Sequence, residues 1–292
     1  MTIFQKLRSA FGSTKLDIDA RFEMQRIAIS GTMSRFYMAR DRKTDETIGL
    51  KICNSEKVEV FETRFKGLKK PSEGEIALSL KHPNIVETLE YGTTTDHSQY
   101  ILMEFLHGPG LHVLIRTRDS IVEGKRVSLI KQMAESVEHV HRSNYIHRDI
   151  CPRNFICDPS AKTLKLIDFG LTLPERRAFR QPGNRTGTPM YMAPEIVKRR
   201  WTDPRVDIFA LGVTAYHLCT YELPWPMAEN PAMTAMSHET VKPADIFSLA
   251  EDLDPTLGAT IMQCLEVDPD KRPATATEFL RMIEDVESEA RT

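Results

Sequence analysis

The spacing of apolar residues changes character once along this chain of 292 residues. Residues 24–53 alternate apolar and polar positions, a pattern that predicts three short strands, and residues 82–106 predict two more. After Gly108-Pro109-Gly110 the apolar residues recur at helical spacing, in segments that begin at residues 111, 126, 206 and 276. A β-rich first third followed by a helix-rich remainder predicts an α+β chain in two lobes.

One helix is expected within the first part of the chain, over residues 72–81. Ser72 is a suitable N-cap, and Glu75 three residues later completes a capping box. Pro71 removes a backbone donor and disfavours helix in the residue before it. The helix should therefore begin near Ser72 and leave Glu73 in its first turn.

The composition excludes several classes of protein. Hydrophobic residues make up 41% and charged residues 27%, which excludes a disordered or collagen-like chain. A net charge of −2 argues against nucleic acid or a membrane surface as the partner. Five scattered cysteines favour a reducing compartment, and no apolar run approaches the ~18–20 residues that cross a bilayer. We therefore expect a cytoplasmic protein with no integral membrane segment.

Two short motifs carry the chemistry. Residues 145–156 read YIHRDICPRNFI, in which Asp149 can accept a hydroxyl proton and the amide oxygen of Asn154 can ligate a hard cation. Nineteen residues after Asp149, an apolar strand ends in the carboxylate of Asp168, a natural place to hold Mg²⁺. Gly170 permits a sharp departure of the backbone after it.

These motifs, in this order and spacing, resemble those of the eukaryotic-type protein kinase family, Ser/Thr type. The resemblance extends from about Phe22 to Glu287. It implies a two-lobe kinase fold with a β-rich N-lobe at 22–106 and a mainly helical C-lobe at 107–288. Residues 1–21 would then form an N-terminal extension and residues 289–292 a C-terminal tail.

The same resemblance assigns a role to individual residues. Asp149 would be the catalytic base, and Asn154 and Asp168 would hold Mg²⁺. ATP would bind between the lobes, with Lys51 on its α- and β-phosphates and Glu73 as the ion-pair partner of Lys51. Glu75 is the alternative partner. Further nucleotide contacts are expected from Gly31 in the phosphate loop, from Met103 as gatekeeper, and from the backbone of Glu104 to Leu106 at the hinge.

Three more positions follow the family pattern. Asp207 should buttress the catalytic loop, and Arg272 should pair with Glu195. The segment GTPMYMAPE at 187–195 resembles the Ser/Thr form, in which the hydroxyl of Thr188 reaches toward the catalytic Asp. The expected substrates are therefore Ser and Thr hydroxyls of proteins.

The phosphate loop departs from the family. The three positions of its GxGxxG pattern are Ile29, Gly31 and Ser34, in a chain with only 14 glycines. Phe36 stands where a valine is usual, and Gly49 where a small alanine is usual. Either these two changes compensate each other, or the nucleotide pocket is loosened.

The catalytic loop departs as well. Cys151 stands where Ser/Thr kinases usually have a lysine that contacts the γ-phosphate. Our hypothesis is that Arg153 neutralises the charge that develops on the γ-phosphate; the alternative is an arginine that faces solvent or binds substrate. Cys151 is either a packed residue or a reactive thiol.

The segment between these motifs is rich in arginine. Arg176, Arg177, Arg180 and Arg185 face a single acid, Glu175. Such a run is usually a solvated loop, but it could favour acidic substrates or be organised by phosphate. Thr186 is the candidate phosphorylation site.

Two functions stay open at this point. The favoured one is a protein kinase that uses ATP and Mg²⁺, with a protein substrate and with an upstream kinase or regulatory partner. The alternative is a pseudokinase that binds nucleotide and acts as a scaffold or regulator.

Overall fold

The computed structural model describes residues 15–30 and 34–287, with only the backbone described for residues 26–30. The chain forms two compact units. The first comprises residues up to Lys66 together with Glu87–Phe105, and the second comprises Gly67–Val86 together with the residues from Leu106 onward.

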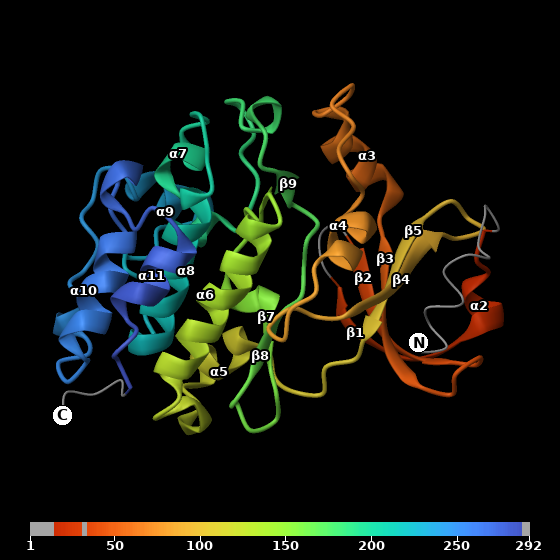
Figure 1. The fold of residues 1–292 in the computed structure, drawn as a ribbon, viewed down its shortest axis with the longest axis horizontal. Coiled ribbons are helices and arrows are strands. Elements are labelled where there is room, and N and C mark those ends of the chain that lie inside the picture. Colours follow the sequence, from red (N-terminus) through yellow and green to blue (C-terminus); the bar gives the residue numbers. More distant parts are fainter. Residues whose placement is uncertain (1–14, 31–33, 288–292) are drawn as a thin grey trace. The chain divides into compact units, whose positions relative to one another are not determined.

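Among its described residues, the first unit is a five-stranded antiparallel sheet with two short helices. Its strands lie in the order β1-β2-β3-β5-β4, and Figure 1 shows them in red to yellow. The elements are α2 (Ile18–Arg21), β1 (Phe22–Ser30), β2 (Ser34–Asp41), β3 (Thr47–Cys53), α3 (Ser55–Thr63), β4 (Thr88–Thr93) and β5 (Gln99–Glu104). The five strands predicted from the sequence are confirmed.

The central strand β3 explains the order of the sheet. It pairs with β2 on one side and β5 on the other, and most of its residues are buried. A central strand of this kind has neighbours on both edges, so its backbone groups are used within the sheet. The core of this unit consists of Phe22, Ala39, Ile48, Leu50, Tyr100 and Leu102.

Over its described residues, the second unit is mainly helical, with two short two-stranded sheets. Its helices are α4 (Glu73–Ser79), α5 (Leu111–Thr117), α6 (Arg126–Arg142), α7 (Pro194–Val197), α8 (Arg205–Thr220), α9 (Pro231–Ser237), α10 (Pro255–Cys264) and α11 (Ala276–Met282). One sheet pairs β6 (Tyr145–Ile146) with β9 (Leu173–Pro174), and the other pairs β7 (Phe155–Cys157) with β8 (Leu164–Leu166). Single 3₁₀ turns are η1 (Ser120–Val122), η2 (Pro152–Asn154), η3 (Arg177–Phe179), η4 (Pro189–Tyr191), η5 (Ile246–Ser248) and η6 (Pro269–Lys271).

Helix α8 is the centre of the second unit. Nearly all of its residues are buried, and α6 and α10 both pack against it. Gly212 allows the approach of α10, because a Cβ at that position would overlap the Cβ of Cys264. Within residues 15–30 and 34–287, no helix has the length and apolar composition that crossing a bilayer requires.

Helix α4 begins where the sequence predicts. Ser72 accepts a hydrogen bond from the amide of Glu75, and the Glu75 carboxylate accepts one from the amide of Ser72, so the capping box is present. Glu73 is the first helical residue. The helix ends at Ser79, two residues earlier than the apolar pattern suggests.

Candidate active site

The carboxylate of Asp149 is held from two directions. The side-chain amide of Asn154 donates to its Oδ2 at 3.0 Å and to its backbone carbonyl at 2.7 Å. The backbone amide of Thr188, 39 residues away in sequence, donates to Oδ1 at 2.7 Å. Both oxygens therefore have a fixed direction before any substrate arrives.

The same contacts orient the amide of Asn154. Because its Nδ2 is used by Asp149, its Oδ1 is left as an acceptor, and no donor in the described part of the chain occupies it. An amide oxygen without a hydrogen-bond donor, beside a carboxylate, is a suitable ligand for a hard cation. The donor set of this loop thus fits Mg²⁺.

Asp207 supports the backbone of the loop that carries Asp149. This fully buried residue in the first turn of α8 accepts the backbone amides of His147 at 2.8 Å and Arg148 at 2.7 Å. Arg148 has a φ of 72°, and the two hydrogen bonds stabilise this unusual left-handed backbone. The predicted buttress is therefore present.

The electrostatics of Asp207 favour its charged form. Burial by itself would raise the pKa of this carboxyl. The hydrogen bond and charge of His141, whose Nε2 lies 2.8 Å from Oδ2, and the amide of Arg148 outweigh it, so the pKa is lowered.

Asp168 follows β8, and its surroundings involve a second carboxylate. Oδ1 of Asp168 accepts the amide of Gly170 at 2.9 Å. A Cβ built on Gly170 would lie 3.2 Å from that Oδ1 and 3.4 Å from Oε2 of Glu73. Glu73 therefore lies beside this turn, whereas the carboxylate of Glu75 is used in the cap of α4.

Thr188 contacts Asp149 through its backbone amide, whereas we expected its side-chain hydroxyl to reach toward Asp149. Its backbone amide makes the contact, and its hydroxyl lies 3.6 Å from Sγ of Cys151. Gly187 brings the segment this close, with a φ of 131° and a would-be Cβ only 2.9 Å from the carbonyl of Arg148. The expectation of a hydroxyl contact is wrong, because Cys151 offers the hydroxyl a partner in the place of the usual lysine.

Cys151 is a packed residue. Its side chain is buried, and burial together with the nearby charge of Asp149 raises the pKa of the thiol to about 12. Arg153 in contrast is exposed and has no ion pair within the described residues. The two interpretations of Arg153 both stay open.

In the first unit, Phe36 and Gly49 fit one another. A Cβ on Gly49 would lie 2.7 Å from Cζ of Phe36 and 3.1 Å from Cγ of Met103. The ring of Phe36 thus occupies the space that an alanine methyl would need. This geometry supports compensation between the two departures, and not a loosened pocket.

The other residues that the sequence assigns to the nucleotide site lie in both units or outside the described residues. Lys51 pairs with Phe36 and Ile101 across the sheet. The backbone amide of Glu104 donates to the carbonyl of Glu87 at 3.0 Å, and Leu106 belongs to the second unit. Gly31 lies outside the described residues.

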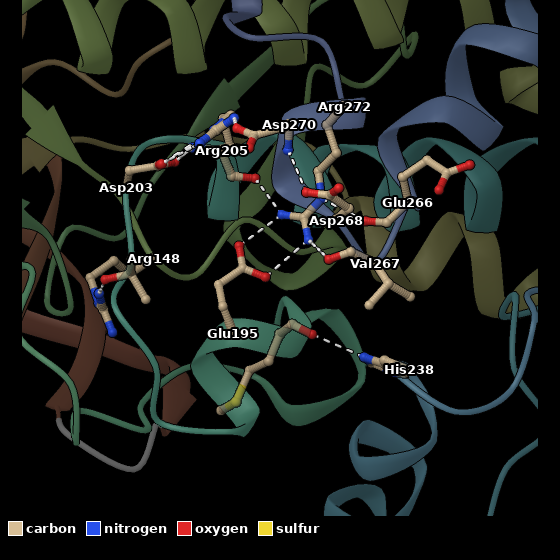
Figure 2. A network of polar contacts seen from close by, with 12 residues as sticks. Arg148, Glu195, Asp203, Arg205, His238, Glu266, Val267, Asp268, Asp270 and Arg272 are labelled. Atoms are coloured by element: carbon tan, nitrogen blue, oxygen red, sulfur yellow. Dashed lines mark hydrogen bonds and ion pairs between the residues drawn. The ribbon is translucent and has the colours of Figure 1, made fainter.

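A buried ion pair anchors the end of the Thr188 segment. Both guanidinium ends of Arg272 bond the two oxygens of Glu195, at 2.8 and 2.9 Å. Its remaining three donors meet the carbonyls of Arg205, Glu266 and Val267, as Figure 2 shows. All five N–H groups are satisfied, so the predicted pair is present with nothing left unbonded.

Comparison with known families agrees with this geometry. The model of the protein kinase domain matches residues 23–282. This chain belongs to the protein kinase domain family. Similar curated proteins include the serine/threonine-protein kinase pkn3 of Myxococcus xanthus, 28% identical over 93% of this chain and 51% of the relative. The serine/threonine-protein kinase PknB of Mycolicibacterium smegmatis is 27% identical over 91% of this chain and 43% of the relative.

A vertebrate protein is similar as well. The hormonally up-regulated neu tumor-associated kinase homolog of Xenopus tropicalis is 32% identical over 79% of this chain and 32% of the relative. The chain spans about half or less of the length of these relatives.

The sequence did not point to two histidines that support this kinase domain. His141 bonds Asp207 from the end of α6, and His238 bonds the carbonyl of Met192 at 2.9 Å. His238 lies 46 residues from Met192 and 4.2 Å from the ring of Trp225, so no local pattern marks it. His141 could have been noticed as a polar residue on the apolar side of α6, close before the catalytic loop.

Proposed function

We propose that this chain transfers the γ-phosphoryl group of ATP to Ser and Thr hydroxyls of proteins, with Asp149 as the catalytic base. The observation that carries the proposal is the double support of the Asp149 carboxylate by Asn154 and Thr188. One support comes from the catalytic loop and the other from the segment that reads GTPMYMAPE. The hydrogen bond from the Thr188 amide thus positions both the proton acceptor, Asp149, and the segment on the substrate side.

The other roles follow from the residues present. Lys51 contacts the α- and β-phosphates, and Glu73 orients Lys51. Asp168 and the amide oxygen of Asn154 would hold Mg²⁺, which when bound neutralises charge on the phosphate oxygens. Further contacts to the nucleotide come from Gly31, Met103, Glu104 and Leu106. We place the N-lobe at residues 22–106 and the C-lobe at residues 107–288.

The reaction balances through Asp149. The substrate hydroxyl oxygen bonds to the γ-phosphorus while the bond from that phosphorus to the β-bridging oxygen breaks, and ADP leaves with the electron pair. The hydroxyl proton passes to the Asp149 carboxylate. Such a base contributes about 10²–10⁴ in rate, and the remainder comes from positioning and charge neutralisation.

Arg153 is our candidate for a further charge at the γ-phosphate. Cys151 is buried and burial raises the pKa of its thiol, which keeps the side chain neutral; it cannot replace the positive charge of the usual lysine. Arg153 is an exposed cation immediately before Asn154. A guanidinium keeps its charge at all physiological pH values and suits phosphate geometry.

The second candidate is a pseudokinase that scaffolds or regulates a partner. It is favoured by the buried, uncharged Cys151 in the lysine position and by Ile29 and Ser34 in the phosphate loop. We further propose cytoplasmic location, on the ground of five cysteines that form no disulfide. We also propose that the activity is regulated, either by a partner or by an upstream kinase that phosphorylates Thr186.

Phosphoryl transfer from γ-labelled ATP tests the two candidates. Wild type should label itself or a generic Ser/Thr peptide in the presence of Mg²⁺, and Asp149→Asn should lose at least 10² of the rate. Asp252→Asn, an exposed carboxylate elsewhere in the second unit, is the matched control and should keep full activity. Equal signal from wild type and Asp149→Asn would remove Asp149 from its role, and nucleotide binding without transfer by wild type would favour the pseudokinase.

A further inference from the structure

The stretch before the Thr188 segment, at residues 180–183, lies beside the stretch after it, at residues 199–202. The amide of Gly183 donates to the carbonyl of Arg199 at 3.2 Å, and the amide of Thr202 donates to the carbonyl of Arg180 at 3.3 Å. The guanidinium of Arg177 lies 6.0 Å from the ring centre of Trp201. The two stretches carry several cations and one indole, which we call the basic surface: Arg176, Arg177, Arg185, Arg199 and Trp201.

Nearby acids are already occupied by other cations. Glu175 pairs with Arg180, and Glu195 is buried against Arg272. Glu239 pairs with Lys198 at 3.2 Å and Arg200 at 2.7 Å.

The four arginines of the basic surface therefore keep their charge uncompensated. Across residues 15–30 and 34–287, no carboxylate forms an ion pair with any of them. Arg176, Arg177 and Arg199 are exposed, and Trp201 is 42% exposed. Side chains of this kind, rigid and planar at the tip, are suited to bidentate contacts with anions.

The basic surface is connected directly to the catalytic loop. Arg148, the residue before Asp149, is buried and donates to the carbonyl of Asn184 at 3.0 Å and to the hydroxyl of Thr202 at 3.2 Å. It thereby holds both stretches at the loop. Arg148 is itself not part of the surface, since its guanidinium is enclosed by these contacts.

We infer that the basic surface binds anionic side chains of the protein substrate, next to the hydroxyl that is phosphorylated. The inference rests on the proposed function, since it names the substrate class of the same site. The recognised chemistry is a cluster of negative charge on a peptide, supplied either by Asp and Glu residues or by a residue that is already phosphorylated. A guanidinium fork accepts both, and the exposed indole of Trp201 covers the stem of the bound side chain.

Peptide kinetics test the inference. Three serine peptides of one sequence would be compared, with four glutamates, four glutamines or one phosphoserine beside the acceptor. The double variant Arg176→Gln/Arg177→Gln should raise KM for the glutamate or the phosphoserine peptide about tenfold at low salt, with kcat nearly unchanged. Its KM for the glutamine peptide should stay at the wild-type value, and 0.5 M salt should remove the preference of the wild type.

The matched control removes two exposed lysines outside the basic surface, Lys162→Gln/Lys271→Gln, and should leave all three peptides unaffected. Equal KM values of wild type for the glutamate, phosphoserine and glutamine peptides would overturn the inference. Fluorescence anisotropy of the labelled peptides gives an answer even if no phosphate is transferred, so failure of the proposed function is seen separately. Tighter binding of a single-stranded oligonucleotide than of either anionic peptide, lost in the arginine variant, would likewise overturn it in favour of nucleic acid.

Discussion

In the β-sheet of the first unit, the ring of Phe36 occupies the space that a side chain at Gly49 would need, since a Cβ on Gly49 would lie 2.7 Å from Cζ of that ring. Neither residue has its usual family identity, and each makes sense only beside the other. A larger residue on β2 is accommodated by the loss of a methyl group on β3.

Gly49→Ala should therefore destabilise the protein by about 1–3 kcal/mol through overpacking, and should weaken ATP binding. The double variant Phe36→Val/Gly49→Ala should recover most of the loss, because it restores a fitting pair. Urea unfolding and nucleotide titration measure both effects. If the single variant is as stable as wild type, the ring is not constrained by Gly49.

The buried pair of Arg272 and Glu195 leads to a second prediction. Arg272→Lys should cost about 1–3 kcal/mol of unfolding free energy, because one ammonium cannot satisfy a carboxylate and three carbonyls together. Arg281→Lys is the control, since that side chain is 74% exposed and 3.9 Å from Glu278, and it should change little. Similar stabilities of the two variants would show that the network in Figure 2 contributes nothing beyond packing.

Buried histidines should make the second unit sensitive to mild acid. Burial lowers the pKa of His238 and of His217 to about 4, against about 6.5 in the unfolded chain. Between these values the unfolded chain binds more protons, so stability is complete above pH 6.5 and falls as the pH drops toward 4. Each histidine accounts for about 3 kcal/mol over that window.

His238→Gln should flatten this part of the pH profile, measured as unfolding free energy by denaturant titration. Glutamine keeps a donor for the carbonyl of Met192 without a titrating group. His97→Gln, at an exposed position, is the control and should leave the slope as in wild type. An unchanged slope in His238→Gln would mean that this ring does not titrate with unfolding.

The thiols should be unreactive in the native protein. None of the five cysteines forms a disulfide and all are buried, and burial raises the pKa of Cys151 and of Cys157 to about 12. Ellman's reagent at pH 8 should label the native protein slowly and the denatured protein fully. A fast native thiol that disappears in Cys151→Ser would show that the catalytic loop opens readily.

The role of Arg153 is tested by Arg153→Ala. If its charge acts on the γ-phosphate, kcat should fall about 10²-fold, while the KM for ATP changes little. Arg116→Ala, an exposed arginine on α5, serves as the control. An unchanged kcat would instead support an arginine that faces solvent.

The sequence by itself determined the features that depend on local or ordered patterns. The cap of α4 was predictable because Ser72 and Glu75 are three residues apart and bond within one turn. The five strands and the main helices were predictable because apolar periodicity reports which face is buried. Family membership followed from motifs in a fixed order, and the resemblance also predicted the Arg272 and Asp207 contacts.

Only the tertiary structure decided the features that depend on which side chains share a space. It brought Phe36 against Gly49, turned the Thr188 hydroxyl to Cys151, and placed the Thr188 amide on Asp149. It also distinguished arginines with a carboxylate partner, such as Arg180, from those without one. Contacts of this kind join residues far apart in the chain, and their geometry is set by packing, which the order of residues alone does not express.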